Sequence, residues 1–134
     1  MERLNTTTDV LDLSEARKRL QLVRPLVAQI MATTQRLQML PAEGASEYSP
    51  DIELERATLE DDFRRTLTAM NSHGAILKDP SIGLIDFFTW RGNDIAYLCW
   101  RHDEPDLAWW HGVHEGFSGR KPLDHGEADT QAAS

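Results

Sequence analysis

Apolar residues in the N-terminal half of the chain recur at alternating intervals of three and four positions. Between residues 14 and 40 this spacing is kept by Ala16, Leu20, Val23, Val27, Ile30 and Leu37. The pattern is typical of a helix with a heptad seam, and Ser14 followed by Glu15 is typical of a helix start. Pro25 removes one backbone hydrogen bond, but the seam keeps its phase across it. We therefore predict one kinked helix that ends near Leu40.

A second helix is predicted after a short loop. Residues 41–49 are rich in Pro, Gly and Ser, and Ser49 then places a capping hydroxyl before Pro50 at the first helical position. Gly74 suits a left-handed helix end. The apolar positions between them are Ile52, Leu59, Phe63, Leu67 and Met70. Two long helices joined by a short loop predict an antiparallel, coiled-coil-like helical hairpin over residues 14–73.

After Pro80 the period changes from helical to extended. The runs GLIDFFTW and IAYLCWR flank Gly92 and Asn93, which is a strong signal for a β-hairpin. With these two as the turn residues, Asp86 lies opposite Cys99. The stretch HDEPD then makes a turn, and LAWWH is the third strand.

The expected register of the third strand decides which side chains share a face. It places Leu107, Trp109 and His111 on the face that carries Tyr97, Cys99 and Arg101, and a slip of one residue would reverse this. Both faces of the small sheet are apolar, so each needs a cover. The helical hairpin can cover one face, and the segment GFSGRKPL or a second subunit can cover the other.

The predicted fold class is α+β, with a long antiparallel two-helix hairpin and a small three-stranded antiparallel β-meander. We expect a single domain over residues 1–123, made of the hairpin at 14–73, the meander at 82–112 and a tail segment at 113–123. The polar residues 124–134 are expected to form a disordered C-terminal tail.

Composition narrows the classes of function. Fourteen Lys and Arg stand against 22 Asp and Glu, which gives a net charge of −8 and disfavours nucleic-acid binding. The lone Cys99 excludes an intrachain disulfide and suits a reducing compartment. No secretory signal and no apolar run of membrane-spanning length is found, so we expect a cytoplasmic protein that does not enter membranes.

The C-terminal stretches LCWR, EP, WWH and GFSGRKPL, read with SEARKRLQLVRPLV and GLIDF, resemble a prokaryotic family known as domain of unknown function 2203. The resemblance covers roughly residues 10–123 and implies no agreed biochemical role. By contrast, His102 and His114 stand where that pattern commonly has a glycine and a variable residue. The residues that match the usual pattern are Asp86, Cys99, Trp100, Arg101, Glu104, Trp110, His111, Gly116, Phe117, Gly119 and Arg120.

Residues 99–114 also contain a possible metal site. Cys99, His102, His111 and His114 have the spacing Cys-x2-His-x8-His-x2-His, a mixed sulfur and nitrogen set that zinc accepts. On the expected register Cys99 and His111 are diagonal neighbours, and Asp86 provides a third ligand and leaves an open position. Zinc or iron are the candidate metals for Cys99, His111 and Asp86. The tryptophans between them are predicted to be core.

Two other chemistries fit the same residues. Cys99 and His111 form a possible nucleophile and base oriented by Asp86, although a cysteine among aromatic strand residues is usually inert. Asp86, Arg101, Glu104 and Arg120 form either an anionic-ligand site or a structural ion-pair network, since an arginine fork suits both.

A heptad-seamed hairpin and a sheet with two apolar faces leave surface to bury, which favours a homodimer. We therefore expect a non-enzymatic, self-associating scaffold or binding module, with no identified protein partner. The alternative is a small metal- or anionic-ligand-binding protein with its site around Asp86, Cys99, Arg101 and His111.

Overall fold

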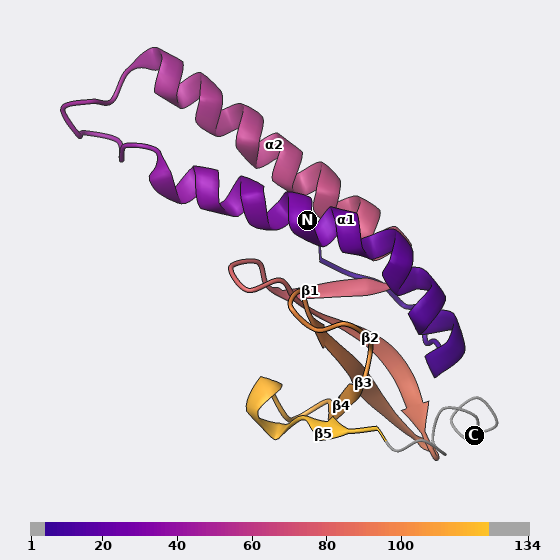
Figure 1. Cartoon of the computed structure of the whole chain (residues 1–134). Helices are drawn as coiled ribbons and strands as arrows, with labels where there is room; N and C mark the ends of the chain where they lie inside the picture. The colour runs from indigo at the N-terminus through magenta and orange to yellow at the C-terminus, as the bar shows by residue number, and fades with distance from the viewer. Residues whose placement is uncertain (1–4, 124–134) are drawn as a thin grey trace.

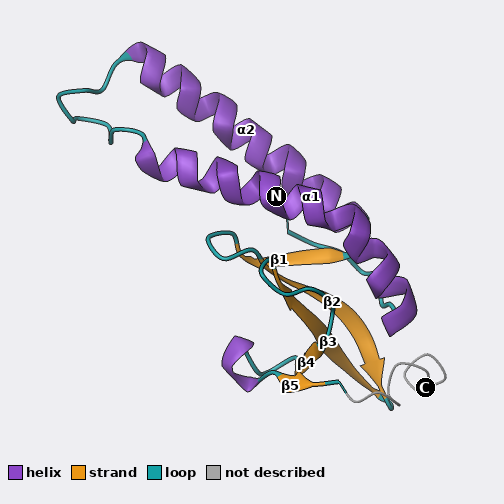
Figure 2. Cartoon of the chain, in the orientation of Figure 1, coloured by secondary structure: helices purple, strands orange, loops and turns teal. Residues whose placement is uncertain are grey.

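The computed structural model describes residues 5–123, and within them two α-helices precede an antiparallel sheet (Figure 1). Helix α1 spans Leu13–Met39 and helix α2 spans Pro50–Ser72. In Figure 2 the helices lie side by side over one face of the sheet, and the loop that joins them projects beyond its edge. None of the helices in this part of the chain is both long and apolar enough to cross a membrane.

The helix starts confirm one expectation and correct another. Ser49 caps α2, its hydroxyl accepting a hydrogen bond from the N–H of Ile52, and Pro50 is the first helical residue. The expected cap at Ser14 is wrong, because Asp12 caps α1 and accepts from the N–H of Glu15 at 2.8 Å. The helix begins earlier because Leu13 is already helical and buried. Helix α1 continues through Pro25 as one uninterrupted helix.

The sheet has five strands in the described residues, so the prediction of three is wrong. Their order in space follows the chain, and all neighbours are antiparallel. Sequence reasoning missed β1 because this strand is short and begins directly after Gly74, a turn residue with positive φ. It missed β5 because two residues that include a proline carry no strand signal. The strands are β1 (Ala75–Asp79), β2 (Leu84–Arg91), β3 (Asp94–Arg101), β4 (Trp109–Gly112) and β5 (Lys121–Pro122).

The expected strand register is confirmed at the first hairpin. At the second hairpin it is confirmed for Trp109 and His111 but not for Leu107. Asp86 pairs with Cys99, and β4 places His111 opposite Tyr97, so His111 is on the same face as Cys99 and diagonal to it. The expectation for Leu107 is wrong. It precedes β4, is fully buried, and belongs to the core between sheet and helices, because the chain turns into the strand only at Trp109.

The hydrophobic core fills the space between the helices and one face of the sheet. Apolar side chains of α1 and α2 meet those of β1, β2 and β3, and the largest that are fully buried are Trp100, Phe87, Leu13, Leu20 and Ile30. Alternation along β2 and β3 then turns Asp86 and Cys99 to the opposite face. We call this opposite face the outer face.

The chain itself covers part of the outer face. A 3₁₀ turn, η1, spans Phe117–Gly119 and precedes β5. The guanidinium of Arg120 lies 4.6 Å from the ring centre of Trp109 and 4.7 Å from that of Phe117. A second subunit is therefore not the only means of covering this face, and the homodimer stays a prediction. The expected disordered tail, 124–134, lies outside the described residues.

Candidate metal centre

Three adjacent strands bring Asp86, Cys99 and His111 together on the outer face. Asp86 comes from β2, Cys99 from β3 and His111 from β4, and their relative exposures are 1%, 0% and 3%. One possible donor atom from each lies within 4.8 Å of the others. In the part of the chain that the structure describes, this is the only group of His, Cys, Asp or Glu with that geometry.

Both ring nitrogens of His111 lie within hydrogen-bond distance of an oxygen atom. Its Nδ1 lies 2.9 Å from the carbonyl oxygen of Gly112, and its Nε2 lies 3.1 Å from Oδ2 of Asp86. Because a carbonyl only accepts, Nδ1 carries a proton, and Nε2 donates a second proton to Asp86 when the ring is protonated. The hydrogen bond to Asp86 raises the pKa of His111, and burial opposes this rise.

Asp86 has one satisfied oxygen and one that is not. Oδ2 faces His111 and lies 4.0 Å from the ammonium of Lys78. Oδ1 is buried and has no hydrogen-bond partner among residues 5–123. A buried acceptor without a partner is costly, on the order of 1–3 kcal/mol and more for a charged group. The Asp86 carboxylate therefore keeps one oxygen free to accept a further ligand.

The Cys99 thiol is not set up as a nucleophile. Burial raises its pKa to about 12, with further contributions from the negative charge of Asp86 and from a hydrogen bond of the thiol to that side chain. Reactive cysteines have lowered pKa values, because the thiolate is the attacking species. This environment disfavours a Cys99–His111 catalytic pair. A divalent cation beside the sulfur would displace the proton and give the thiolate a counter-charge.

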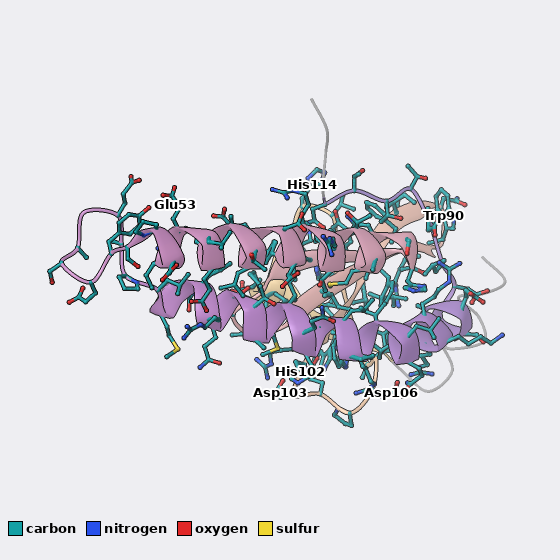
Figure 3. The ribbon with its side chains drawn as sticks, turned by 90° about the horizontal axis from the view of Figure 1, so that it is seen from above. Glu53, Trp90, His102, Asp103, Asp106 and His114 are labelled. Atoms are coloured by element: carbon teal, nitrogen blue, oxygen red, sulfur yellow. The ribbon has the colours of Figure 1, made fainter. Side chains whose placement is uncertain are left out.

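The Cys-x2-His and His-x2-His spacing does not assemble a four-ligand site. Seen from above, His102 and His114 lie at opposite sides of the molecule (Figure 3). The His102 ring packs edge-on against Trp100, which belongs to the helix-facing core, at 6.0 Å between ring centres. Strand alternation, and not the sequence spacing, selects Cys99 and His111, and it adds Asp86.

The other three candidate binding residues contact one another beside the cluster. Nη2 of Arg120 donates to Oε1 of Glu104 at 2.8 Å, and these side chains are 9% and 15% exposed. The same Oε1 accepts from the backbone N–H of Arg101 at 2.8 Å. The Arg101 guanidinium pairs with Asp103 at 2.6 Å. This arrangement has the form of an ion-pair network that fixes the tail segment over β3 and β4.

Sequence reasoning missed a pocket in front of the cluster and its charged residue, Lys78. The pocket has a volume of about 190 Å³, and Asp86, His111, Tyr97 and Phe117 are among its lining residues. Lys78 was missed because β1 was missed. The signal was present, since a strand directly after the Gly74 turn pairs Ile76 with Asp86 and turns Lys78 to the same face.

Comparison with known proteins gives a family without an assigned activity. A family model described as "Uncharacterized conserved protein (DUF2203)" matches residues 10–123, which confirms the resemblance seen in the sequence. No curated protein and no solved structure matches the chain significantly.

Proposed function

The chain belongs to the uncharacterised family DUF2203, and we propose that it binds a transition-metal ion, Zn²⁺, at Asp86, Cys99 and His111. The observation that carries the proposal is the buried carboxylate of Asp86, which stands beside a sulfur and an imidazole nitrogen and whose Oδ1 lacks a hydrogen-bond partner among the described residues. One cation would satisfy all three groups.

The donor set supports zinc. Oxygen, sulfur and nitrogen are all ligands that Zn²⁺ accepts, at about 2.0–2.3 Å, so ligand atoms in a tetrahedral site are roughly 3.3–3.8 Å apart. The donor atoms here lie within 4.8 Å of one another. A side-chain movement of about 1 Å closes the triangle to those distances. Three protein ligands also leave a fourth position open, which is the pattern of zinc sites that bind a further ligand.

The surroundings of the ligands support the same proposal. The hydrogen bond from Nδ1 of His111 to the Gly112 carbonyl fixes the ring and leaves Nε2 as the donor atom, as is usual for metal-bound histidines. The thiol of Cys99 has to lose its proton on binding, so uptake of zinc is coupled to release of a proton.

The proposal is tested by elemental analysis of protein purified without an affinity tag, after removal of metal and dialysis against Zn²⁺. We expect about one bound zinc per chain, because the three ligands form one site. Cys99→Ser and His111→Ala should each lower retention at least tenfold, since each removes a donor atom.

His114→Ala is the matched control, because His114 is exposed and lies outside the cluster. It should bind zinc like the wild type. A wild-type protein that retains no metal, or equal losses in His111→Ala and His114→Ala, would contradict the proposal.

Self-association is a second candidate, favoured by one observation on the helices. Seam residues that lie over the sheet, such as Val27 and Met70, are fully buried. Those nearer the loop are only half-buried, namely Leu37, Ile52, Leu59 and Phe63. A second copy that packs against this end of α1 and α2 would bury them, as in a four-helix arrangement.

A further inference from the structure

The pocket in front of the cluster opens onto two of the three proposed ligands. Asp86 and His111 line it, whereas Cys99 is fully buried. The other walls come from β1, β3 and the segment after β4. Its volume of about 190 Å³ is that of roughly six water molecules at about 30 Å³ each, which suits a molecule of few heavy atoms. The pocket therefore adjoins two of the proposed ligands and has room for a small molecule.

The charges around this pocket favour an anion. With Cys99 and Asp86 ionised, the protein anions balance a divalent cation, and Lys78 adds one positive charge. Its ammonium lies 4.0 Å from Oδ2 of Asp86 and 4.7 Å from the ring centre of Tyr97. The Lys78 side chain is 37% exposed, so this charge is accessible from solvent.

The remaining carboxylate in the wall is already paired. Oε1 of Glu115 accepts from the N–H of Gly112 at 2.7 Å and from Nζ of Lys121 at 2.9 Å, and its Oε2 also accepts from Lys121. It therefore contributes little net negative charge to the pocket. The metal-bound site carries one excess positive charge, and a monoanion neutralises it.

The lining also selects the class of anion. Beside the charged groups the pocket presents apolar surface from Leu84, Tyr97, Val113 and Phe117. A small carboxylate with a short apolar group fits this combination, because its oxygen can complete the metal's coordination while its apolar end contacts these walls. A phosphate dianion would leave the site with net negative charge and no apolar contact.

Building on the proposed metal site, we propose that a small monocarboxylate binds as the fourth metal ligand in this pocket and that Lys78 is its charge partner. Lys78 pairs with the carboxylate oxygen that is not on the metal, and Phe117 and Tyr97 flank the apolar end. Lys78 is thus a ligand-binding residue, separate from the three residues that hold the metal.

The experiment uses the full chain loaded with Co²⁺, whose visible spectrum reports the geometry of its ligands. Acetate and propionate are titrated in a buffer that does not coordinate metals. We expect a saturable spectral change, with propionate binding at least as tightly as acetate because its methyl group contacts the apolar walls. Lys78→Gln should weaken acetate binding about tenfold, since it removes a charge-assisted hydrogen bond. Lys78→Arg should keep most of the affinity.

Lys18→Gln is the matched control, because Lys18 is an exposed lysine on α1, across the molecule from the pocket. It should leave acetate binding unchanged. A Co²⁺ spectrum that does not respond to acetate, equal affinity in wild type and Lys78→Gln, or tighter binding of inorganic phosphate would overturn the carboxylate proposal and leave the metal site standing. A chain that takes up no Co²⁺ would overturn both, and the absence of any visible spectrum identifies that case.

Discussion

Asp86 stands in the middle of an apolar strand, where an unpaired carboxylate is costly. Its neighbours on either side, Ile85 and Phe87, are fully buried in the core, so strand alternation fixes Asp86 on the outer face. A buried carboxylate of this kind is stable only when another part of the chain supplies a hydrogen-bond or charge partner. His111 supplies part of that partner through its Nε2. The same alternation puts Cys99 directly opposite Asp86.

The buried environment of Cys99 makes its thiol unreactive. Burial raises the pKa of its thiol to about 12, so the folded, metal-free protein should hold almost no thiolate at pH 8. We expect alkylation by iodoacetamide to be at least a hundredfold slower than for free cysteine, as followed by mass spectrometry.

The same protein in denaturant is the control, where the thiol should react at the ordinary rate. Labelling of the folded, metal-free chain as fast as that of free cysteine would instead support a nucleophilic role for Cys99.

The turn between β1 and β2 packs closely against α1 and the β3–β4 turn. Gly83 has φ +66°, and a β-carbon built there would lie 2.6 Å from Cβ of His102 and 2.7 Å from the sulfur of Met31. The backbone of Gly83 also accepts a hydrogen bond from the N–H of His102. Glycine is therefore needed where this turn, the β3–β4 turn and α1 meet.

Gly83→Ala should lower the free energy of unfolding by about 3 kcal/mol, from a left-handed backbone cost of roughly 1 kcal/mol and close contacts worth about 2 kcal/mol more. Gly92→Ala is the matched control, since Gly92 has φ +65° but nothing within 4 Å of the built carbon. It should lose only about 1 kcal/mol. Urea denaturation measures both, and equal losses would show that the contacts at Gly83 do not matter.

The two proposed functions lie in separate regions of the molecule. The proposed metal site lies on the outer face of the sheet, and the half-buried seam residues belong to the parts of α1 and α2 nearer their joining loop, which projects past the sheet (Figure 1). The apolar groove there is lined by Leu37 and Phe63, with Glu60 and Arg64 beside them. The proposed metal binding and the proposed association of helices therefore use different surfaces.

Self-association predicts a mass in solution of about twice the 15.2 kDa of the chain, as measured by light scattering. Leu37→Glu should convert this species to a monomer, because it puts a charge into the apolar groove. Leu22→Glu is the control, since Leu22 is 56% exposed on the same helix but outside the groove. A wild-type monomer, or dissociation by both variants, would contradict this interface.

The sequence by itself determined the parts of this protein that depend on short-range chemistry. Heptad spacing predicted the two helices, Ser49 and Pro50 the start of the second, and Gly92–Asn93 the first hairpin with Asp86 opposite Cys99. These predictions are correct because helix periodicity, helix caps and tight turns are set by residues only a few positions apart. The same register was enough to indicate that Cys99 and His111 share a face.

Only the tertiary structure decided what depends on contacts between distant segments. β1 and β5 are stabilised by pairing with β2 and β4, and β5, with two residues, is too short to be recognised alone. Pairing of β1 with β2 brings Lys78 beside Asp86, and side chains between residues 113 and 117 form a wall of the pocket next to them. His102 and His114, whose spacing suggests a metal site in the sequence, lie outside the cluster, and strand pairing brings Asp86, Cys99 and His111 together instead.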